Sequence, residues 1–426
     1  MPHQPSETFS EHLFRETYGE VFSVLFRKYG PAHQSDLEDA LQDAFYTALK
    51  TWPLSGSPDN PKAWLLQVTQ NKLLNTLKQA GRRARPLSCA SAEAMFEQAT
   101  EPDTEDSQLR LLFALCQPTL SPSAQIMFAL KYLGGFGVQE IAQGLQQSKE
   151  AVYKSLQRSK SFFQQLPPHF LEVPVQHNAQ RLPWVLKSIY LLFNEGYDTA
   201  SGNSLLNHDI CLEAVRLTKL LVNPFGEQAP EVHHLLALLY FQCARFAART
   251  QSDGAFVPLS EQDRNLWDRK LMTLGFRHLH QTFPAQGNAY YTQACIAGLH
   301  LTAPTYAQTD WAGILRLYNI LVQQEPSSFV VQINRAVALA HCQGPTSAIA
   351  LLQQLPQEAH NYYLYHTALA HLYTQTGQLT EATACYQKAL ALPLSPAHQK
   401  VIQNKLAALA PAVVKPEPTS VPIFLP

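Results

Sequence analysis

The stretch DLEDALQDAFYTALKTWPLSGSPDNPKAWLLQVTQNKLLNTLKQAGRR, from Asp36 to Arg83, predicts two helices joined by a polar loop. Ser35 can cap the first helix, whose acidic first turn complements the helix dipole. Trp52-Pro53 and the polar residues after it are expected to end this helix. The second helix opens at Asn60-Pro61, with proline at its first position. Apolar residues recur at three-and-four spacing in both helices, which indicates one buried stripe on each.

The second helix carries amides and bases on the face opposite its apolar stripe. Its expected core residues are Trp64, Leu65, Val68, Leu73 and Leu77. The residues expected to face outward are Gln67, Asn71, Lys72, Asn75, Lys78 and Gln79, followed by Arg82, Arg83 and Arg85. Because amides can hydrogen-bond base edges while cations hold phosphates, this face suits a nucleic acid.

The chain of 426 residues has a net charge of −1, which excludes a uniformly basic protein, but its charges are segregated. From Glu7 to Asp43, eight acids accompany three bases. The segment from Lys62 to Arg85 holds six bases and no acid, and the segment from Lys131 to Lys160 holds five bases and two acids. Two separated basic helices suit a phosphate backbone, because each neutralised phosphate releases counterions. The alternative is a pair of solvated helix faces.

A second group of helices follows an acidic stretch and has the spacing of a helix-turn-helix. Ser121 can cap a helix that opens on Pro122, the glycines between 134 and 137 form a turn, and Ser148 can cap a last helix. The expected core positions are Ile141, Ala142, Leu145, Val152 and Leu156. The last helix would present Lys149, Tyr153, Lys154, Gln157, Arg158 and Lys160 to a major groove. Such a pattern alone is weak, because many helical hairpins imitate it.

In this order, the two segments resemble the sigma-two and sigma-four domains of extracytoplasmic-function sigma factors. The first resemblance rests on the acidic D-x-x-Q-D-x-F motif and the P-x-x-W-L motif of the quoted stretch. In that family the acidic helix docks on the clamp helices of RNA polymerase, and the helix after P-x-x-W-L melts and reads the minus-ten element. Matched by position, the polymerase-binding residues are Asp36, Asp39, Gln42, Asp43 and Phe45.

The same resemblance places the minus-ten contacts on Asn71, Lys72, Asn75, Lys78, Arg82 and Arg83. Family members usually carry several arginines where this chain has Gln70-Asn71-Lys72 and Asn75-Thr76, which implies weaker promoter melting or affinity. The second segment, led in by the family's L-S-P-x-x-x-x-x-F-x-L-x-Y-x-x-G pattern, resembles the domain that reads the minus-thirty-five element. The helix from Lys149 to Lys160 would make those contacts.

The remaining residues, 181–410, read as stacked helical hairpins. The clearest unit runs from His366 to Leu394, where small and aromatic residues fall as in a tetratricopeptide repeat, and a fainter copy begins at Phe329. The stretches LPWVLKSIYLLFNEGYDTASG, DRNLWDRKL and TDWAGILRLYNIL resemble the long C-terminal extension of one subgroup of these sigma factors. That resemblance implies a regulatory or polymerase-contacting role and names no ligand.

The expected organisation is all-α: sigma region 2 over residues 1–85, an acidic linker over 86–106, sigma region 4 over 107–166, a linker over 167–180, the repeat-like extension over 181–410 and a disordered tail over 411–426. The implied function is that of an alternative sigma factor, not an enzyme, with core RNA polymerase and promoter DNA as partners and no cofactor. No stretch reaches the roughly 18 apolar residues of a membrane helix, and the N-terminus lacks the apolar run of a signal peptide. The expected location is therefore the cytoplasm.

Two other functions stay open on the residues alone. The chain could be an adaptor whose repeats bind a protein while the sigma-like segments keep only a polymerase contact. It could also hold a small-molecule sensor or enzyme site around Glu195 and Asp198, although Gly196 as a helix C-cap is the simpler interpretation. No metal motif accompanies these acids, and the seven cysteines include no C-x-x-C pair and are expected in the core.

Overall fold

The computed structural model describes residues 6–83, 104–145, 147–166, 171, 174–197, 207–250, 256–281, 287–394 and 396–409. The protein is all-α, and within these ranges the extended pairing is limited to one isolated bridge between Thr250 and Phe256. Two compact units divide the chain, Met1–Leu191 and Leu192–Pro426, and the division falls inside one helix. Each unit is described by itself below.

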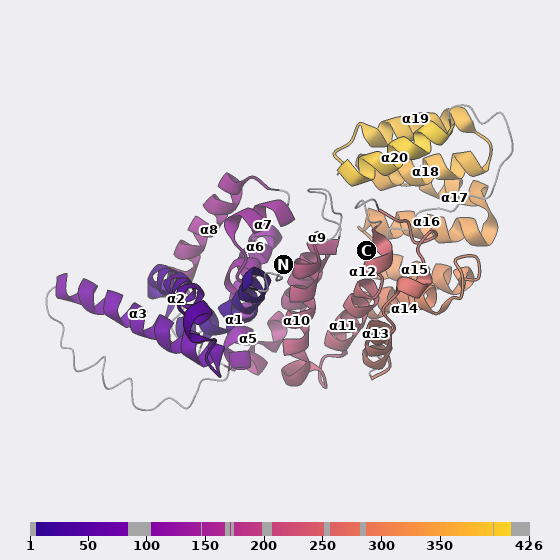
Figure 1. The fold of residues 1–426 in the computed structure, drawn as a ribbon. Helices are drawn as coiled ribbons and strands as arrows, with labels where there is room; N and C mark the ends of the chain where they lie inside the picture. The colour runs from indigo at the N-terminus through magenta and orange to yellow at the C-terminus, as the bar shows by residue number, and fades with distance from the viewer. Residues whose placement is uncertain are drawn as a thin grey trace. The chain divides into compact units, whose positions relative to one another are not determined.

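The first unit begins with three long helices, α1 (Ser6–Tyr29), α2 (Gln34–Ser55) and α3 (Pro61–Arg83), with a short 3-10 turn η1 (Pro31–His33) between the first two (Figure 1). Asn60 caps α3, since its side-chain oxygen accepts a hydrogen bond of 3.0 Å from the Ala63 amide, and Pro61 takes the first helical position as predicted.

The predicted start of α2 was wrong, and the helix continues past Trp52-Pro53 to the start of the polar loop that was predicted to end it. The helix begins at Gln34, before Ser35, and its N-cap His33 makes no side-chain capping hydrogen bond. Pro53 lies inside the last turn, and the helix ends at Ser55, followed by the C-cap residue Gly56, whose φ of 83° no other residue type adopts readily. A proline so close to the exposed C-terminal end removes one solvated hydrogen bond, which explains why the helix continues past it.

Further along the described part of the first unit come α5 (Thr104–Leu115), α6 (Pro122–Tyr132), α7 (Val138–Gly144) and α8 (Lys149–Gln164). The predicted caps are confirmed, because Ser121 accepts a hydrogen bond from the Ala124 amide and Ser148 accepts one from the Ala151 amide. The predicted starts of α6 and α8 are therefore confirmed.

The first three helices and the later four share one hydrophobic core. Phe22 of α1 stacks on Tyr132 of α6 with ring centroids 5.1 Å apart, and Phe26 of α1 meets Phe163 of α8 at 4.9 Å. Gly19 lets α1 approach the end of α6, since a Cβ atom there would lie 1.8 Å from the Leu133 carbonyl oxygen. The two predicted DNA-binding segments are thus packed against each other.

Both expected linkers, 86–106 and 167–180, contain residues that the structure places in helices. Residues 84–103, most of the acidic linker, lie outside the described residues, and α5 already begins at Thr104. Within 167–180, Leu171 and Val175 are buried, the 3-10 helix η3 (Val175–Arg181) forms, and Arg110 donates a hydrogen bond of 3.2 Å to the Leu171 carbonyl. The predicted tail, residues 411–426, lies outside the described residues.

Helix α9 (Leu182–Tyr197) crosses the division into the second unit. The other elements of that unit are α10 (His208–Phe225), α11 (Pro230–Cys243), α12 (Phe246–Arg249), η4 (Arg264–Leu266), α13 (Arg269–Gln281), α14 (Ala289–Thr302), α15 (Trp311–Gln324), α16 (Phe329–Gln343), α17 (Pro345–Gln353), η5 (Gln357–Asn361), α18 (Tyr363–Gln375), α19 (Leu379–Leu390) and α20 (Pro396–Leu409). The last three helices lie side by side (Figure 1).

Two helix pairs of this unit repeat the same arrangement. The short connection in each pair contains a glycine with positive φ: Gly344, at 87°, between α16 and α17, and Gly377, at 76°, between α18 and α19. The buried residues also correspond: Ala336 with Ala370, Ala348 with Ala382, and Leu352 with Tyr386, each pair 34 positions apart. That spacing is the period of tetratricopeptide repeats. Among the described residues no helix is both long enough and apolar enough to cross a bilayer.

Candidate nucleic-acid interface

Helix α2 presents an acidic face. Asp39, Gln42 and Asp43 are exposed, while Leu37, Leu41 and Ala44 on the opposite side are buried. Asp36 is half-buried, and one of its oxygens lies 3.7 Å from Nδ1 of His33, a pair that is ionic only when the histidine is protonated. Four of the five residues matched to polymerase docking therefore have side chains at least partly open to a partner.

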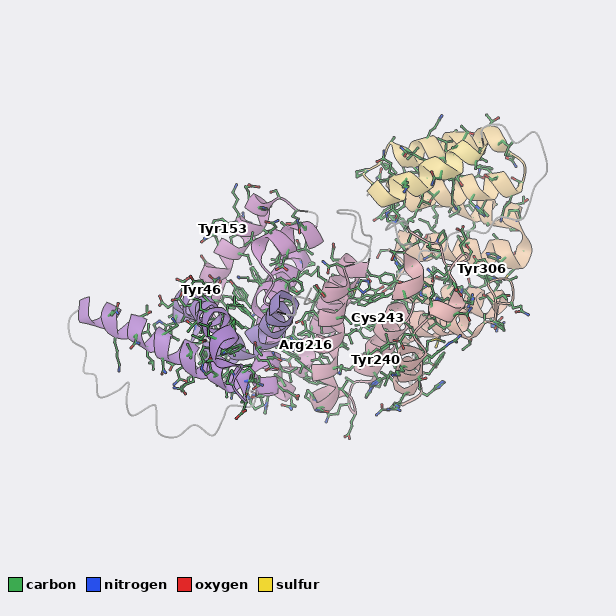
Figure 2. All side chains as sticks on the ribbon, in the orientation of Figure 1. Tyr46, Tyr153, Arg216, Tyr240, Cys243 and Tyr306 are labelled. Carbon is green, nitrogen blue, oxygen red and sulfur yellow. The ribbon has the colours of Figure 1, made fainter. Side chains whose placement is uncertain are left out.

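Phe45 differs from the other four. Its side chain is 6% exposed and stacks on Tyr18 with ring centroids 6.5 Å apart, so it belongs to the core of the unit. The exposed aromatic residue is its neighbour Tyr46, which is 57% exposed beside Lys50, whose Nζ lies 4.2 Å from the ring centroid (Figure 2). Helical periodicity would have found Tyr46, because it falls off the buried stripe.

Helix α3 separates apolar and polar faces along its length. Leu65, Thr69 and Leu73 recur every fourth residue and are buried, and Trp64 packs edge to face on Trp52 at 5.3 Å. The polar face exposes Asn71, Asn75 and Lys78. The side chains of Arg82 and Arg83 lie outside the described residues, although α3 extends to Arg83.

One ion pair, between Asp43 of α2 and Lys72 of α3, joins the acidic face of α2 to the polar face of α3. Nζ of Lys72 lies 3.9 Å from a carboxylate oxygen of Asp43, and both side chains are substantially exposed. An exposed ion pair contributes about 0–1 kcal/mol to the free energy of unfolding, so either residue can exchange it for a contact with another molecule at little cost. Asn71 accepts a hydrogen bond of 3.2 Å from Gln67 one turn earlier, which orients its amide.

Helix α8 also has a buried apolar face and an exposed polar face. Val152 and Phe163 are fully buried, whereas Tyr153, Lys154, Gln157 and Arg158 are exposed, Tyr153 to 56% (Figure 2). The side chain of Lys160 lies outside the described residues. The exposed face of α8 therefore combines cations, an amide and an aromatic ring, the groups that contact phosphates and base edges.

Helices α7 and α8 are held at a fixed angle by buried and polar contacts. Ile141, Ala142 and Leu145 of the α7 segment are buried, and Lys149 donates a hydrogen bond of 3.0 Å from its ammonium to Gln139. Glu140 accepts a hydrogen bond of 2.7 Å from the Gly137 amide and so closes the start of α7. Lys149 is exposed, but one of its ammonium N–H groups is used in the hydrogen bond to Gln139.

The structure describes only one of the two acids that the sequence singles out at the end of α9. Glu195 is half-buried, and Asp198 lies outside the described residues. Gly196 was predicted to be a C-cap, but the helix continues to Tyr197, and the glycine is needed because a Cβ atom there would come within 2.9 Å of Ile210. Within the described part of the chain, no group of three histidine, cysteine or acidic side chains could hold a metal ion.

The cysteines are mostly core residues, as predicted. Cys116, Cys211, Cys243 and Cys385 are buried, and burial raises the pKa of the Cys116 thiol to about 12, which keeps it protonated and unreactive. Two described cysteines are exceptions, since Cys295 is half-buried and Cys342 is exposed, and Cys89 lies outside the described residues.

Comparisons with known proteins give family matches for two segments. Residues 13–83 match sigma-70 region 2, which covers α1 to α3, and residues 181–283 match a family of unknown function (DUF6596). An uncharacterized protein of Rhizobium meliloti (strain 1021) is 34% identical over 394 residues, which make up 89% of this chain and 92% of that protein.

Two further similarities are more limited. A probable ECF RNA polymerase sigma factor, SigI of Mycobacterium tuberculosis, is 32% identical over 111 residues, which span 25% of this chain and 38% of that protein. The crystal structure of yeast Tom70 aligns with a TM-score of 0.34 and 11% identity, covering 89% of this chain and 81% of the Tom70 chain.

Proposed function

Because the chain belongs to one family with the Rhizobium meliloti protein and is a sigma-70 family member through its region 2, we propose that it is an alternative sigma factor. It binds core RNA polymerase in the cytoplasm and directs it to particular promoters, and it catalyses no reaction itself. The observation that carries the proposal is the region 2 match over residues 13–83, on helices whose acidic and polar faces are both exposed.

Helix α2 is the polymerase-docking element. Asp39, Gln42 and Asp43 contact the clamp helices directly, and Asp36 supports them at the edge of the same face. Phe45 acts from within the core, where its packing on Tyr18 fixes the orientation of α2, and Tyr46 takes the exposed aromatic position of the docking face.

Helix α3 captures the minus-ten strand. The exposed amides of Asn71 and Asn75 reach base edges, and Lys72 and Lys78 hold phosphates, with Arg82 and Arg83 extending the cationic track. The Asp43–Lys72 pair lets polymerase binding and strand capture influence each other, since a clamp contact to Asp43 releases the Lys72 ammonium.

Helices α7 and α8 form a helix-turn-helix that reads the minus-thirty-five element. The residues that enter or flank the major groove are Lys149, Tyr153, Lys154, Gln157, Arg158 and Lys160. Support comes from the two confirmed serine caps and from the separation of exposed cations and buried apolar residues along α8.

The second unit regulates this activity. Its 34-residue helical hairpins resemble tetratricopeptide repeats, which present surfaces to other molecules. The proposed regulation is tested by comparing the full chain with a chain lacking the second unit in reconstituted transcription.

The whole proposal is tested by mixing the full chain with bacterial core polymerase and a genomic promoter library. Specific run-off transcripts that depend on the chain are expected. Core binding without any specific transcript would favour an adaptor, and absence of core binding would exclude a sigma factor.

A further inference from the structure

Two arginines lie buried in the second unit, and a third lies half-buried beside them. Arg245 is 3% exposed and Arg249 7% exposed, and Arg264 is half-buried. Within the described part of the chain, none of the three forms an ion pair with a carboxylate. Buried arginines without a counter-charge are costly, because each guanidinium loses its hydration and gains no anion in exchange.

Tyr197, the last residue of α9, accepts hydrogen bonds from two of these arginines. Its hydroxyl oxygen accepts a hydrogen bond of 2.6 Å from Nη2 of Arg245, and its carbonyl oxygen accepts one of 3.1 Å from Nη2 of Arg249. The Arg249 guanidinium also lies 3.6 Å from the centroid of the Tyr197 ring. Within the described residues, the partners that fix both guanidinium groups in place are therefore neutral.

Arg264, in η4, belongs to the same cluster, since burial and then the charge of nearby Arg245 lower the pKa of its guanidinium. Its Nη1 donates hydrogen bonds to the carbonyl oxygens of His300 and Ala303, at 2.6 and 2.9 Å, and its guanidinium lies 4.4 Å from the Trp267 ring centroid. The Asp268 amide donates a hydrogen bond of 2.8 Å to the Ala244 carbonyl, which ties this loop to the backbone beside Arg245. Cys243, labelled in Figure 2, marks the end of α11 just before that point.

Among the described residues, several buried polar atoms of this cluster have no hydrogen-bond partner. The donors are Nε of Arg249, Nη2 of Arg264 and Nε1 of Trp267, and both ring nitrogens of His300, a residue that is 0% exposed, are also unpartnered. Arginine and tryptophan nitrogens can only donate, so the missing partner must supply acceptors. Burial, followed by Arg245 and Arg264, lowers the pKa of His300 to about 3, so its ring is neutral and adds no fourth positive charge.

We propose that Arg245, Arg249 and Arg264 form a binding site for a phosphate group carried by a small-molecule ligand of the second unit. Three guanidinium groups supply the positive charge, and the unpartnered donors of Arg249, Arg264 and Trp267 supply directed hydrogen bonds. A phosphate matches this set better than a carboxylate, because it carries more charge and more acceptor oxygens.

The site also explains why three stretches of the sequence stand out. Tyr197 comes from LPWVLKSIYLLFNEGYDTASG, Arg264 and Trp267 come from DRNLWDRKL, and Trp311 of TDWAGILRLYNIL packs edge to face on His300 at 5.4 Å. Residues far apart in the chain thus converge on one cationic cluster. The proposal concerns binding alone, and it holds whether or not the chain acts as a sigma factor.

The test uses the full chain in a phosphate-free chloride buffer. Inorganic phosphate and glycerol 3-phosphate are titrated by calorimetry and by thermal melting, with sodium acetate and sodium chloride at matched ionic strength as comparisons. Saturable binding and a raised melting temperature are expected with phosphate compounds only. Tighter binding of glycerol 3-phosphate would identify a phosphate monoester as the ligand, and tighter binding of inorganic phosphate would identify free phosphate.

Two variants locate the binding. Arg264→Gln removes one guanidinium, and Trp267→Phe removes only the indole donor while keeping the ring, so both are expected to lower phosphate affinity, the first by tenfold or more and the second several-fold. Trp184→Phe, at an exposed position of α9, is the matched control and should bind as the unchanged chain does. Circular dichroism in chloride checks that each variant is folded.

Three results would overturn the proposal. Equal responses to phosphate and chloride would show no site, and equal binding of acetate would show a carboxylate site instead. Phosphate binding that persists undiminished in folded Arg264→Gln and Trp267→Phe would show an adventitious ion only.

Discussion

The side-chain amide of Gln34, in the first turn of α2, donates a buried hydrogen bond to the hydroxyl of Tyr132 at the end of α6. One turn later Glu38 lies 3.8 Å from Nζ of Lys131, and both of these side chains are largely buried. The proposed docking helix and the proposed helix-turn-helix are therefore joined by polar contacts as well as by the shared aromatic core.

This packing has a consequence for promoter binding. The minus-ten and minus-thirty-five elements lie roughly 25 base pairs apart, or about 85 Å of duplex at 3.4 Å per base pair. A unit in which the two proposed DNA-binding segments share one core is expected to open before both segments reach their elements. The closed arrangement is therefore expected to compete with promoter binding.

Reversing one charge of the Glu38–Lys131 pair should favour opening. Lys131→Glu places two carboxylates together, which should lower the free energy of unfolding by about 2 kcal/mol and raise promoter-specific transcription several-fold. Urea unfolding of the full chain and run-off transcription measure the two effects. The double variant Glu38→Lys with Lys131→Glu restores opposite charges and should return both values toward the starting ones. Folded Lys131→Glu with unchanged or lower transcription would show that the closed arrangement does not limit activity.

The acidic face of α2 should govern polymerase affinity without affecting stability. Replacing exposed Asp39 and Asp43 together by asparagine removes two charges and is expected to weaken binding to core polymerase about tenfold or more. Fluorescence anisotropy with labelled chain measures the affinity, and the melting temperature should stay within a few degrees. Glu381→Gln, an exposed acid on α19, is the matched control. Equal affinities of the two variants would remove α2 from the docking surface.

Contacts from α8 to phosphates should appear in the salt dependence of promoter binding. Arg158→Ala removes one exposed cation, so the slope of log affinity against log salt should become shallower by about 0.9. Lys187→Ala removes an exposed cation of α9 and should leave the slope unchanged. The measurement is a filter-binding titration of holoenzyme at several salt concentrations, and identical slopes for the two variants would argue against α8 as a DNA contact.

Two buried histidines should make the second unit sensitive to acid. Burial is the main cause that lowers the pKa of His300 and of His371 to about 3, from 6.5. Between pH 7.5 and 5.5 the unfolded chain takes up protons at these histidines while the folded chain does not, so stability is lost as the pH falls, by about 1.4 kcal/mol for each histidine.

His371→Gln should therefore reduce the pH-dependent loss of stability by about 1.4 kcal/mol over the same interval. Urea unfolding at pH 7.5 and 5.5 gives the comparison, and His208→Gln, an exposed position on α10, serves as the control. A pH dependence that stays the same in His371→Gln would show that His371 does not cause the acid sensitivity.

The sequence predicted a helix start correctly where that start depends only on a capping residue or a proline within the same turn. Ser121, Ser148 and Asn60-Pro61 each mark a real helix start, because a cap depends on residues within one turn. Ser35 failed for a tertiary reason: α2 begins one residue earlier, at Gln34, whose side chain is anchored on Tyr132 and Glu38. Tyr132 lies in another helix, α6, so no local pattern indicates that contact.

The candidate site was predicted in part. Helical periodicity correctly separated the exposed from the buried face of α3 and α8, whereas the family motif assigned Phe45 to the polymerase although it is a core residue. The cluster of Arg245, Arg249 and Arg264 was not predicted, because it forms only when the end of α9, the start and end of α12, and η4 come together.

The most direct test of the central proposal is whether the chain makes core polymerase open promoter DNA through α3. Permanganate footprinting on a promoter found in the run-off screen should show reactive thymines at the minus-ten element only when the chain is present. Asn71→Ala with Asn75→Ala should abolish that reactivity while core binding persists. Reactive thymines that are the same in this variant, or that never appear with any promoter, would contradict the account.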